Sequence, residues 1–298
     1  MKKGELLKKK ASSTANTSVN IEDLADIDDG VDPDEFEEKL LWLTNNKTLC
    51  PRLTEYWKFT SKGRLRKFMS EKIPITEYMQ TYPALSEMTG YLLLESDFET
   101  LLEGASMQLY ASWPTLAAFI ESKVPKNVKE AILDPFTPEG KKIKTIQALP
   151  YLFNVVTAAK KGKNKQWRPS REKSAESILL HVLDSAAILT TLATRLKDKY
   201  EPFNLSLGPQ AIVVGDTVDS ITKSYVRVNS ILYEVDNPLK AVDIAFKIMH
   251  TLDCQYPKES EREWFFLERS VYAINANKKN PLTVKISSIS NDFSRFQS

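Results

Sequence analysis

The sequence predicts an α+β fold, with a helical N-terminal half and a C-terminal half in which helices pack on a small sheet. In the first half, apolar residues recur at helical spacing, as at Ile75, Tyr78 and Tyr82. In the second half, short apolar runs flank the polar pair Asn229 and Ser230, a pattern typical of a hairpin. The chain has 298 residues, of which 42% are hydrophobic, so it can bury a sizeable core.

Residues 1–32 are predicted to form a disordered arm. Lys, Ser, Thr, Asn and Asp dominate it, and its apolar surface is too small to offset the entropy lost on ordering. The lysines at its start fit either a nuclear localisation signal or a solubilising tail. Ten acidic residues and no basic ones follow between Ile21 and Glu38, so we expect the arm to modulate contacts through its charge.

Residues 33–140 are predicted to be a helical region. Acidic residues after Pro33 lie in the first turn of a short helix, where the helix dipole favours them. A second helix is expected after Pro51, with Leu53 and Trp57 on one face. Further helical stripes lie at 75–82, 91–102, 113–120 and 128–133. Two prolines and a glycine between residues 135 and 140 are expected to break the chain after these helices.

Residues 141–277 are predicted to be an α+β region. Strands are expected at 177–183, 211–215, 224–228 and 231–235. The last two form the hairpin, which gives the small sheet together with at least one more strand. A helix with an apolar stripe at Ile188, Leu189 and Leu192 is expected between the first two strands.

Two capped helices are expected to follow the hairpin. Asn237 is a good N-cap and a proline follows it at the first helical position, which predicts a helix over 239–252. Ser260 and Glu263 have the spacing of a capping box and predict a final helix. Residues 278–298 are interpreted as a polar tail.

Composition and motifs disfavour several classes of protein. The longest apolar runs fall far short of the ~20 residues that cross a bilayer, and no signal-peptide core follows the basic start. We therefore expect a soluble protein of the nucleus or cytoplasm without a membrane partner. Two cysteines and two histidines are too few for a zinc site unless all four converge, and Gly-rich phosphate-binding motifs are absent. No cofactor or metal is predicted.

Two acidic residues are the candidates for catalysis. Asp216 and Asp219 follow the strand that ends at Gly215, a position where α/β enzymes often keep metal ligands. Asp and Gly after a strand are also ordinary turn residues, and we interpret them as a turn. His250, near the end of the predicted helix 239–252, is expected to be a positively charged structural residue favoured by the helix dipole. No catalytic residue is therefore predicted.

The best functional candidate is a basic segment around Trp167. Its basic members are Lys160, Lys161, Lys163, Lys165, Arg168, Arg171 and Lys173. Basic side chains beside an aromatic ring suit phosphates and a stacked base, so the segment is a candidate nucleic-acid site. A solvated loop that Trp167 anchors to the core is the alternative. The sequence carries no helix-turn-helix, RNA-recognition or zinc-finger signature that would decide between them.

Three segments of the chain form a recognisable set. They are YPALSEMTGYLLLESDF (82–98), LPYLFNVVTAAKKGKNKQWRPSREKSAESILLHV (149–182) and LKAVDIAFKIMHTLDCQYPKESEREWFFLERSVYAI (239–274). In pattern and order they resemble the body shared by animal proteins of the sterile alpha motif domain-containing protein-like group, without the sterile alpha motif itself. The resemblance covers residues 36–274. It implies a protein without enzyme activity, and the many genomic copies of some relatives imply an association with mobile elements.

Three hypotheses for the function result. The first is a non-enzymatic interaction or regulatory protein with an unidentified protein partner, which the absence of catalytic motifs and the segregated charge favour. The second is a nucleic-acid-binding protein that uses the basic segment 160–173. The third is a metal-dependent hydrolase or nuclease that uses Asp216 and Asp219. The sequence does not predict an oligomeric state.

Overall fold

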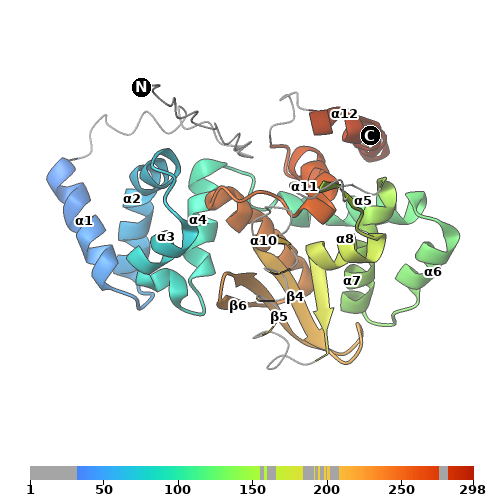
Figure 1. Ribbon diagram of the computed structural model, residues 1–298, viewed down its shortest axis with the longest axis horizontal. Coiled ribbons are helices and arrows are strands. Elements are labelled where there is room, and N and C mark those ends of the chain that lie inside the picture. The colour runs from blue at the N-terminus through green and yellow to red at the C-terminus, as the bar shows by residue number, and fades with distance from the viewer. Residues whose placement is uncertain are drawn as a thin grey trace, which may run out of the picture.

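In a computed structural model, the protein has the predicted α+β fold. The structure describes residues 32–154, 158–159, 166–183, 208–274 and 281–298, together with residues 191, 194, 198, 200 and 201. These ranges contain eleven α-helices and, in the C-terminal half, a four-stranded mixed sheet. In Figure 1, the sheet and α10 (Pro238–Thr251) lie between the N-terminal helices on one side and a group of later helices on the other.

The N-terminal helices confirm the predicted helical region. They are α1 (Pro33–Asn45), α2 (Pro51–Ser70), α3 (Ile75–Thr81) and α4 (Tyr91–Leu101), with a 3₁₀ turn η2 (Pro83–Ser86) before α4. Prolines begin α1 and α2, where a missing N–H leaves no helical hydrogen bond unmade. Asp32, the end of the predicted arm, caps α1 by accepting a hydrogen bond from the backbone N–H of Asp34 at 3.1 Å. Residues 1–31 lie outside the described residues.

The next helices continue past the expected break. They are α5 (Gln108–Lys123), α6 (Lys126–Leu133) and α7 (Pro138–Ala148), and the 3₁₀ turn η3 (Leu149–Leu152) follows α7. The predicted break over residues 135–140 is wrong for residues 138–140, which are already helical. Pro138 is at the first helical position, and Thr137 caps the helix. The Thr137 Oγ1 atom accepts a hydrogen bond from the backbone N–H of Gly140 at 3.0 Å.

The sheet has the strand order β3-β4-β5-β6. Its strands are β3 (Leu179–Val182), β4 (Gln210–Gly215), β5 (Ile221–Val228) and β6 (Ile231–Val235). β3 and β4 are parallel, whereas β4, β5 and β6 are antiparallel neighbours. The predicted hairpin is confirmed, and Asn229 has a φ of 52°, as one residue of so tight a turn requires. The strand expected from 177 begins later, because α8 (Arg171–Ile178) occupies its first residues.

The helix after the hairpin is confirmed, and the later helices differ from expectation. Asn237 caps α10 by accepting from the backbone N–H of Lys240 at 2.9 Å. The capping box at Ser260 does not form before α11 (Glu261–Phe266), because the Ser260 hydroxyl is buried and accepts a hydrogen bond from Ser177 at 2.7 Å. A π-helical turn, η6 (Leu267–Val271), follows α11.

The predicted polar tail is wrong over α12 (Pro281–Gln297). Ile286 and Phe293 of this helix are buried. The Phe293 ring lies 5.1 Å from that of Phe119 in α5 and 5.7 Å from that of Phe266 in α11. The apolar stripe of α12 is therefore stabilised by partners from two distant parts of the chain.

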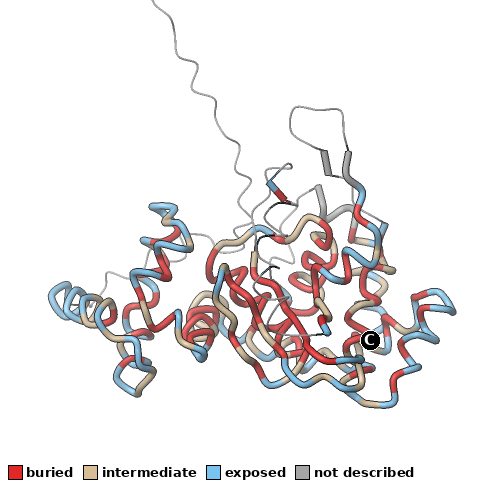
Figure 2. The backbone as a smooth tube through the Cα atoms, turned by 60° about the horizontal axis from the view of Figure 1, so that its bottom comes forward, coloured by how far each residue is buried: buried red, intermediate tan, exposed pale blue. Residues whose placement is uncertain are grey.

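One hydrophobic cluster joins the two halves. It includes Trp57 of α2, Val213 of β4, Phe246 of α10 and Phe293 of α12. Figure 2 shows buried backbone positions running through the middle of the molecule, with exposed positions on the outer turns of the helices. The helical half and the sheet therefore share a core.

Candidate functional site

The basic segment is not one loop. Strands β1 (Ala158–Ala159) and β2 (Gln166–Trp167) pair antiparallel, with Ala158 opposite Trp167, and α8 begins at Arg171. A single solvated loop, the alternative for the basic segment 160–173, is therefore wrong at β2 and from Arg171 onward. The side chains of Lys160, Lys161, Lys163 and Lys165 lie outside the described residues, as does that of Trp167.

The described basic residues of the segment divide into two kinds. Arg168, which precedes α8, and Lys173, in the first turn of α8, are exposed. Arg171 is partly buried, with its guanidinium carbon 5.3 Å from the centre of the Tyr151 ring and Nη2 donating to the Phe153 carbonyl oxygen at 3.5 Å. Arg171 thus fixes α8 to the turn after α7, whereas Arg168 and Lys173 remain accessible.

The first turn of α8 also fixes a carboxylate. Ser170 caps the helix by accepting from the backbone N–H of Lys173 at 3.3 Å. Hydrogen bonding with the Ser170 side chain lowers the pKa of Glu172, and the Tyr151 hydroxyl contributes in the same direction. Glu172 is therefore held in its charged form beside Tyr151.

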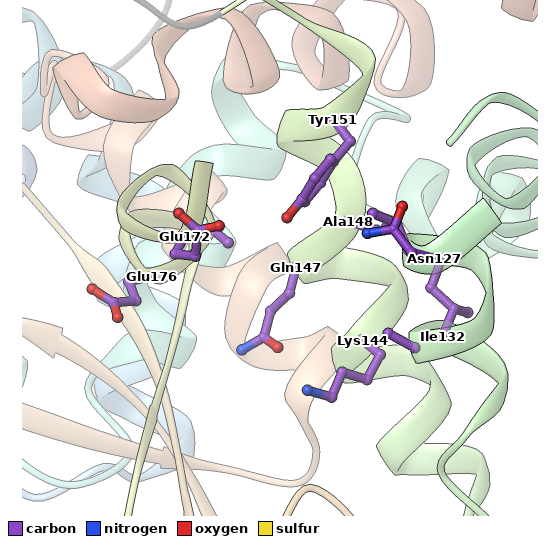
Figure 3. A pocket seen from close by; sticks show the side chains of 11 residues that line it. Asn127, Ile132, Lys144, Gln147, Ala148, Tyr151, Glu172 and Glu176 are labelled. Carbon is purple, nitrogen blue, oxygen red and sulfur yellow. The ribbon is translucent and has the colours of Figure 1, made fainter. Parts of the chain in front are cut away.

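A groove of about 340 Å³ lies beside this turn, between α6, α7 and α8; we call it the α6–α8 groove. Its lining residues are Asn127, Val128, Ala131, Ile132, Lys144, Gln147, Ala148, Tyr151, Glu172, Ala175 and Glu176. The apolar members Val128, Ile132, Ala148 and Ala175 are buried. In Figure 3, the side chains of Lys144 and Gln147 extend from α7 into the space that faces α8. An apolar floor with polar walls is the usual composition of a binding site.

The charged residues of the α6–α8 groove lack ion-pair partners. Lys144 is partly buried on α7, and Glu172 and Glu176 are exposed one turn apart on α8. None of the three is within 4.0 Å of an opposite charge among the described residues, although neighbouring Lys142 pairs with Glu139 at 2.7 Å. These three charges are therefore available to a ligand.

A second cavity, of about 560 Å³, is lined in part by residues of β5 and β6 and reaches the start of α7. Its charged lining residues are Glu139, Lys223, Glu234, Asp219 and Asp236. Most of them already have partners: Lys223 pairs with Glu234, Glu139 with Lys142, and Asp219 with Thr137. This cavity offers a ligand fewer unpaired charges than the α6–α8 groove.

Of the two candidate catalytic acids, Asp219 has a structural position. The Asp219 carboxylate accepts from the Thr137 hydroxyl at 2.6 Å and from its backbone N–H at 2.9 Å, and these bonds lower its pKa. Asp219 therefore ties the β4–β5 turn to the start of α7. Asp216 is exposed. Within the described ranges, no group of three His, Cys, Asp or Glu side chains could hold a metal ion.

His250 is neutral, which corrects the expected imidazolium. Burial lowers its pKa to about 3. The Tyr256 hydroxyl donates its proton to Glu268 at 2.9 Å, so the His250 Nε2–H must donate to the Tyr256 oxygen, 2.8 Å away. Desolvation thus outweighs the helix dipole.

Sequence reasoning missed the α6–α8 groove. Its signal was the spacing of Glu172 and Glu176, four residues apart, which places both carboxylates on one helix face. The lysine-rich run before them suggested a loop, which hid that spacing.

Comparisons with protein-family models, curated proteins and solved structures gave no match for this chain. Of the helices that the structure describes, none combines the length and the apolar run that a bilayer crossing needs.

Proposed function

We propose that this protein is a non-enzymatic interaction protein that binds a short segment of a protein partner in the α6–α8 groove. One observation carries the proposal: three charged side chains line an apolar floor and form no ion pair with another described residue. The apolar floor supplies affinity through burial, and the fixed charges supply specificity.

The test is a peptide selection with the purified full chain from a random display library, followed by affinity measurements on the enriched peptides. We expect Ala131→Trp to abolish binding, because exposed Ala131 lines the groove and an indole ring would fill it. Lys129→Trp is the matched control, since Lys129 is exposed on the same helix and does not line the groove. Equal binding by the two variants, or no enriched peptide, would refute the proposal.

The resemblance to the sterile alpha motif domain-containing protein-like group supports a protein without enzyme activity and suggests an association with mobile elements. A divalent-metal-dependent nuclease or hydrolase activity that Asp216→Ala abolishes would overturn the non-enzymatic part of the proposal.

Nucleic-acid binding by the basic segment is the second candidate. It is favoured by the exposure of Arg168 and Lys173 beside β2, since the four lysines of 160–165 lie between β1 and β2 in sequence. Binding to labelled single- and double-stranded DNA and RNA should then fall steeply between about 50 and 200 mM salt. A variant with Lys160, Lys161, Lys163 and Lys165 changed to Ala should lose it. Salt-independent binding would exclude this candidate.

A further inference from the structure

The walls of the α6–α8 groove carry opposite charges. We propose that the groove selects a partner segment with a basic side chain, preferably arginine, close to an acidic one. The basic side chain binds at Glu172 and Glu176 on α8, and the acidic one binds at Lys144 on α7. This inference rests on the proposed function and specifies the chemistry of the partner.

The α8 wall favours a cation. Glu172 and Glu176 lie four residues apart, about 6 Å along the helix axis, and like charges at this spacing repel each other. A cation between them would relieve that repulsion. The hydrogen bonds from Ser170 and Tyr151 keep Glu172 charged and in place. A guanidinium group presents its donors in a planar fork that matches the geometry of carboxylates, which favours arginine over lysine.

The α7 wall favours an anion. Lys144 is partly buried, so its aliphatic stem lies along the wall of the groove while its ammonium group stays accessible. The side chain of Gln147 extends beside it in Figure 3 and can accept a hydrogen bond from a backbone N–H, or donate one to a backbone carbonyl, of a bound segment. A carboxylate near Lys144 would complete the charge pattern.

The size of the groove limits what it can hold. Small-ligand pockets measure roughly 300–1,000 Å³, so a groove of about 340 Å³ is at the small end of that range and admits only part of a bound segment. A whole helix, about 10 Å across, would not enter it. Selection must therefore depend on the charges of a few neighbouring residues.

The test compares the peptides that wild type and variants select from the same library. Wild type should enrich Arg or Lys next to Asp or Glu. Glu172→Gln/Glu176→Gln should lose the preference for the basic residue and bind wild-type peptides about three- to tenfold more weakly. Lys144→Met should lose only the preference for the acidic residue. The triple variant Lys144→Glu/Glu172→Lys/Glu176→Lys should bind peptides in which the acid and the base are exchanged.

The outcomes separate this inference from the proposed function. If peptides are enriched and Ala131→Trp blocks them, but their charges are random or unaffected by the variants, the charge pattern is refuted and the interaction site stands. If no peptide depends on Ala131, both are refuted. Circular dichroism of each variant shows whether it is folded.

Discussion

Charged side chains are paired with a counter-ion in the interior of the helical half but have none among the described residues in the α6–α8 groove. In the interior, the side chains of Arg64 and Asp97 are both 0% exposed, and Nη2 of Arg64 lies 2.9 Å from Oδ1 of Asp97. Ser61 donates to the same carboxylate at 2.6 Å. In the groove, Lys144, Glu172 and Glu176 have no described counter-ion. A buried charge must be paired because desolvation is so unfavourable, whereas a charge in contact with water can stay unpaired and bind a ligand.

A second group of paired charges, of three residues around buried Lys247, follows the interior pattern. Lys247 of α10 lies between Asp243, at 2.7 Å, and Glu95 of α4, at 2.6 Å. Tyr272 also donates to Asp243 at 2.7 Å. These contacts hold α10 against α4 and therefore stabilise the fold. Their charges are used within the protein and not for a partner.

The largest effect is expected for Asp97→Leu. Removing one member of a buried pair strands the other charge, which should lower the free energy of unfolding by about 3–5 kcal/mol. Urea unfolding followed by circular dichroism measures this. Arg64→Met/Asp97→Leu should recover much of the loss, because no charge is then left unpaired. A loss below about 1 kcal/mol for Asp97→Leu would break the contrast between interior and groove.

Glu263 sharpens the contrast, since it is an interior carboxyl whose Oε2 accepts no hydrogen bond from the described residues. Burial raises its pKa to about 7. The folded state therefore binds this proton more tightly than the unfolded state, and its stabilising contribution is lost as the pH rises through 7. We expect Glu263→Gln to be more stable than wild type at pH 8, by up to about 3 kcal/mol, with little difference at pH 4.

His250 makes the free energy of unfolding depend on pH in the opposite direction to Glu263. Urea unfolding at a series of pH values measures both effects. Its pKa is lower in the folded state, about 3, so the unfolded state binds the proton first and stability is lost as the pH falls from about 6.5. Because Glu263 contributes with the opposite sign between about pH 4.5 and 7, the test uses the Glu263→Gln variant: a stability of that variant that does not change below pH 6 would contradict the neutral His250.

Gly140→Ala tests the Asp219 carboxylate, which is hydrogen-bonded to Thr137 at the start of α7. A methyl group at Gly140 would lie 2.5 Å from Oδ1 of Asp219 and 2.9 Å from Oγ1 of Thr137. We expect thermal unfolding to show a loss of about 1–2 kcal/mol, since crowding outweighs the helix propensity gained by alanine. Gly140→Ala/Asp219→Ala should be less sensitive to the methyl group, because the clashing carboxylate is gone. If Gly140→Ala is as stable as wild type, the Asp219 side chain can move away from the methyl group without cost, and its contact with Thr137 does not hold the β4–β5 turn in place.

The smallest effects are expected in the groove. Glu172→Gln/Glu176→Gln and Lys144→Met should change the free energy of unfolding by less than about 0.5 kcal/mol, because charges that stay in contact with water and form no ion pair contribute little to stability. Differential scanning calorimetry at neutral pH measures these changes. A loss as large as that of Asp97→Leu would show that the groove charges stabilise the fold and are not free for a partner.

Local signals explain which parts of the fold the sequence could predict. The β5–β6 hairpin and α10 have their turn and cap residues in the sequence itself, at Asn229 and Asn237. The helix α12 could not be recognised, because Phe293 packs on Phe119 and Phe266, which are far away in sequence. The α6–α8 groove escaped for the same reason, since three separate helices form it.

The position of Phe293 also has a consequence for synthesis. Phe119 emerges from the ribosome early, but one of its aromatic neighbours, Phe293, is made much later. Contacts of such large sequence separation close slowly, because a long loop must be ordered first. During translation, α5 therefore presents an apolar face that nothing in the nascent chain can yet cover fully, and a chaperone that binds such faces would protect the protein until α12 is made.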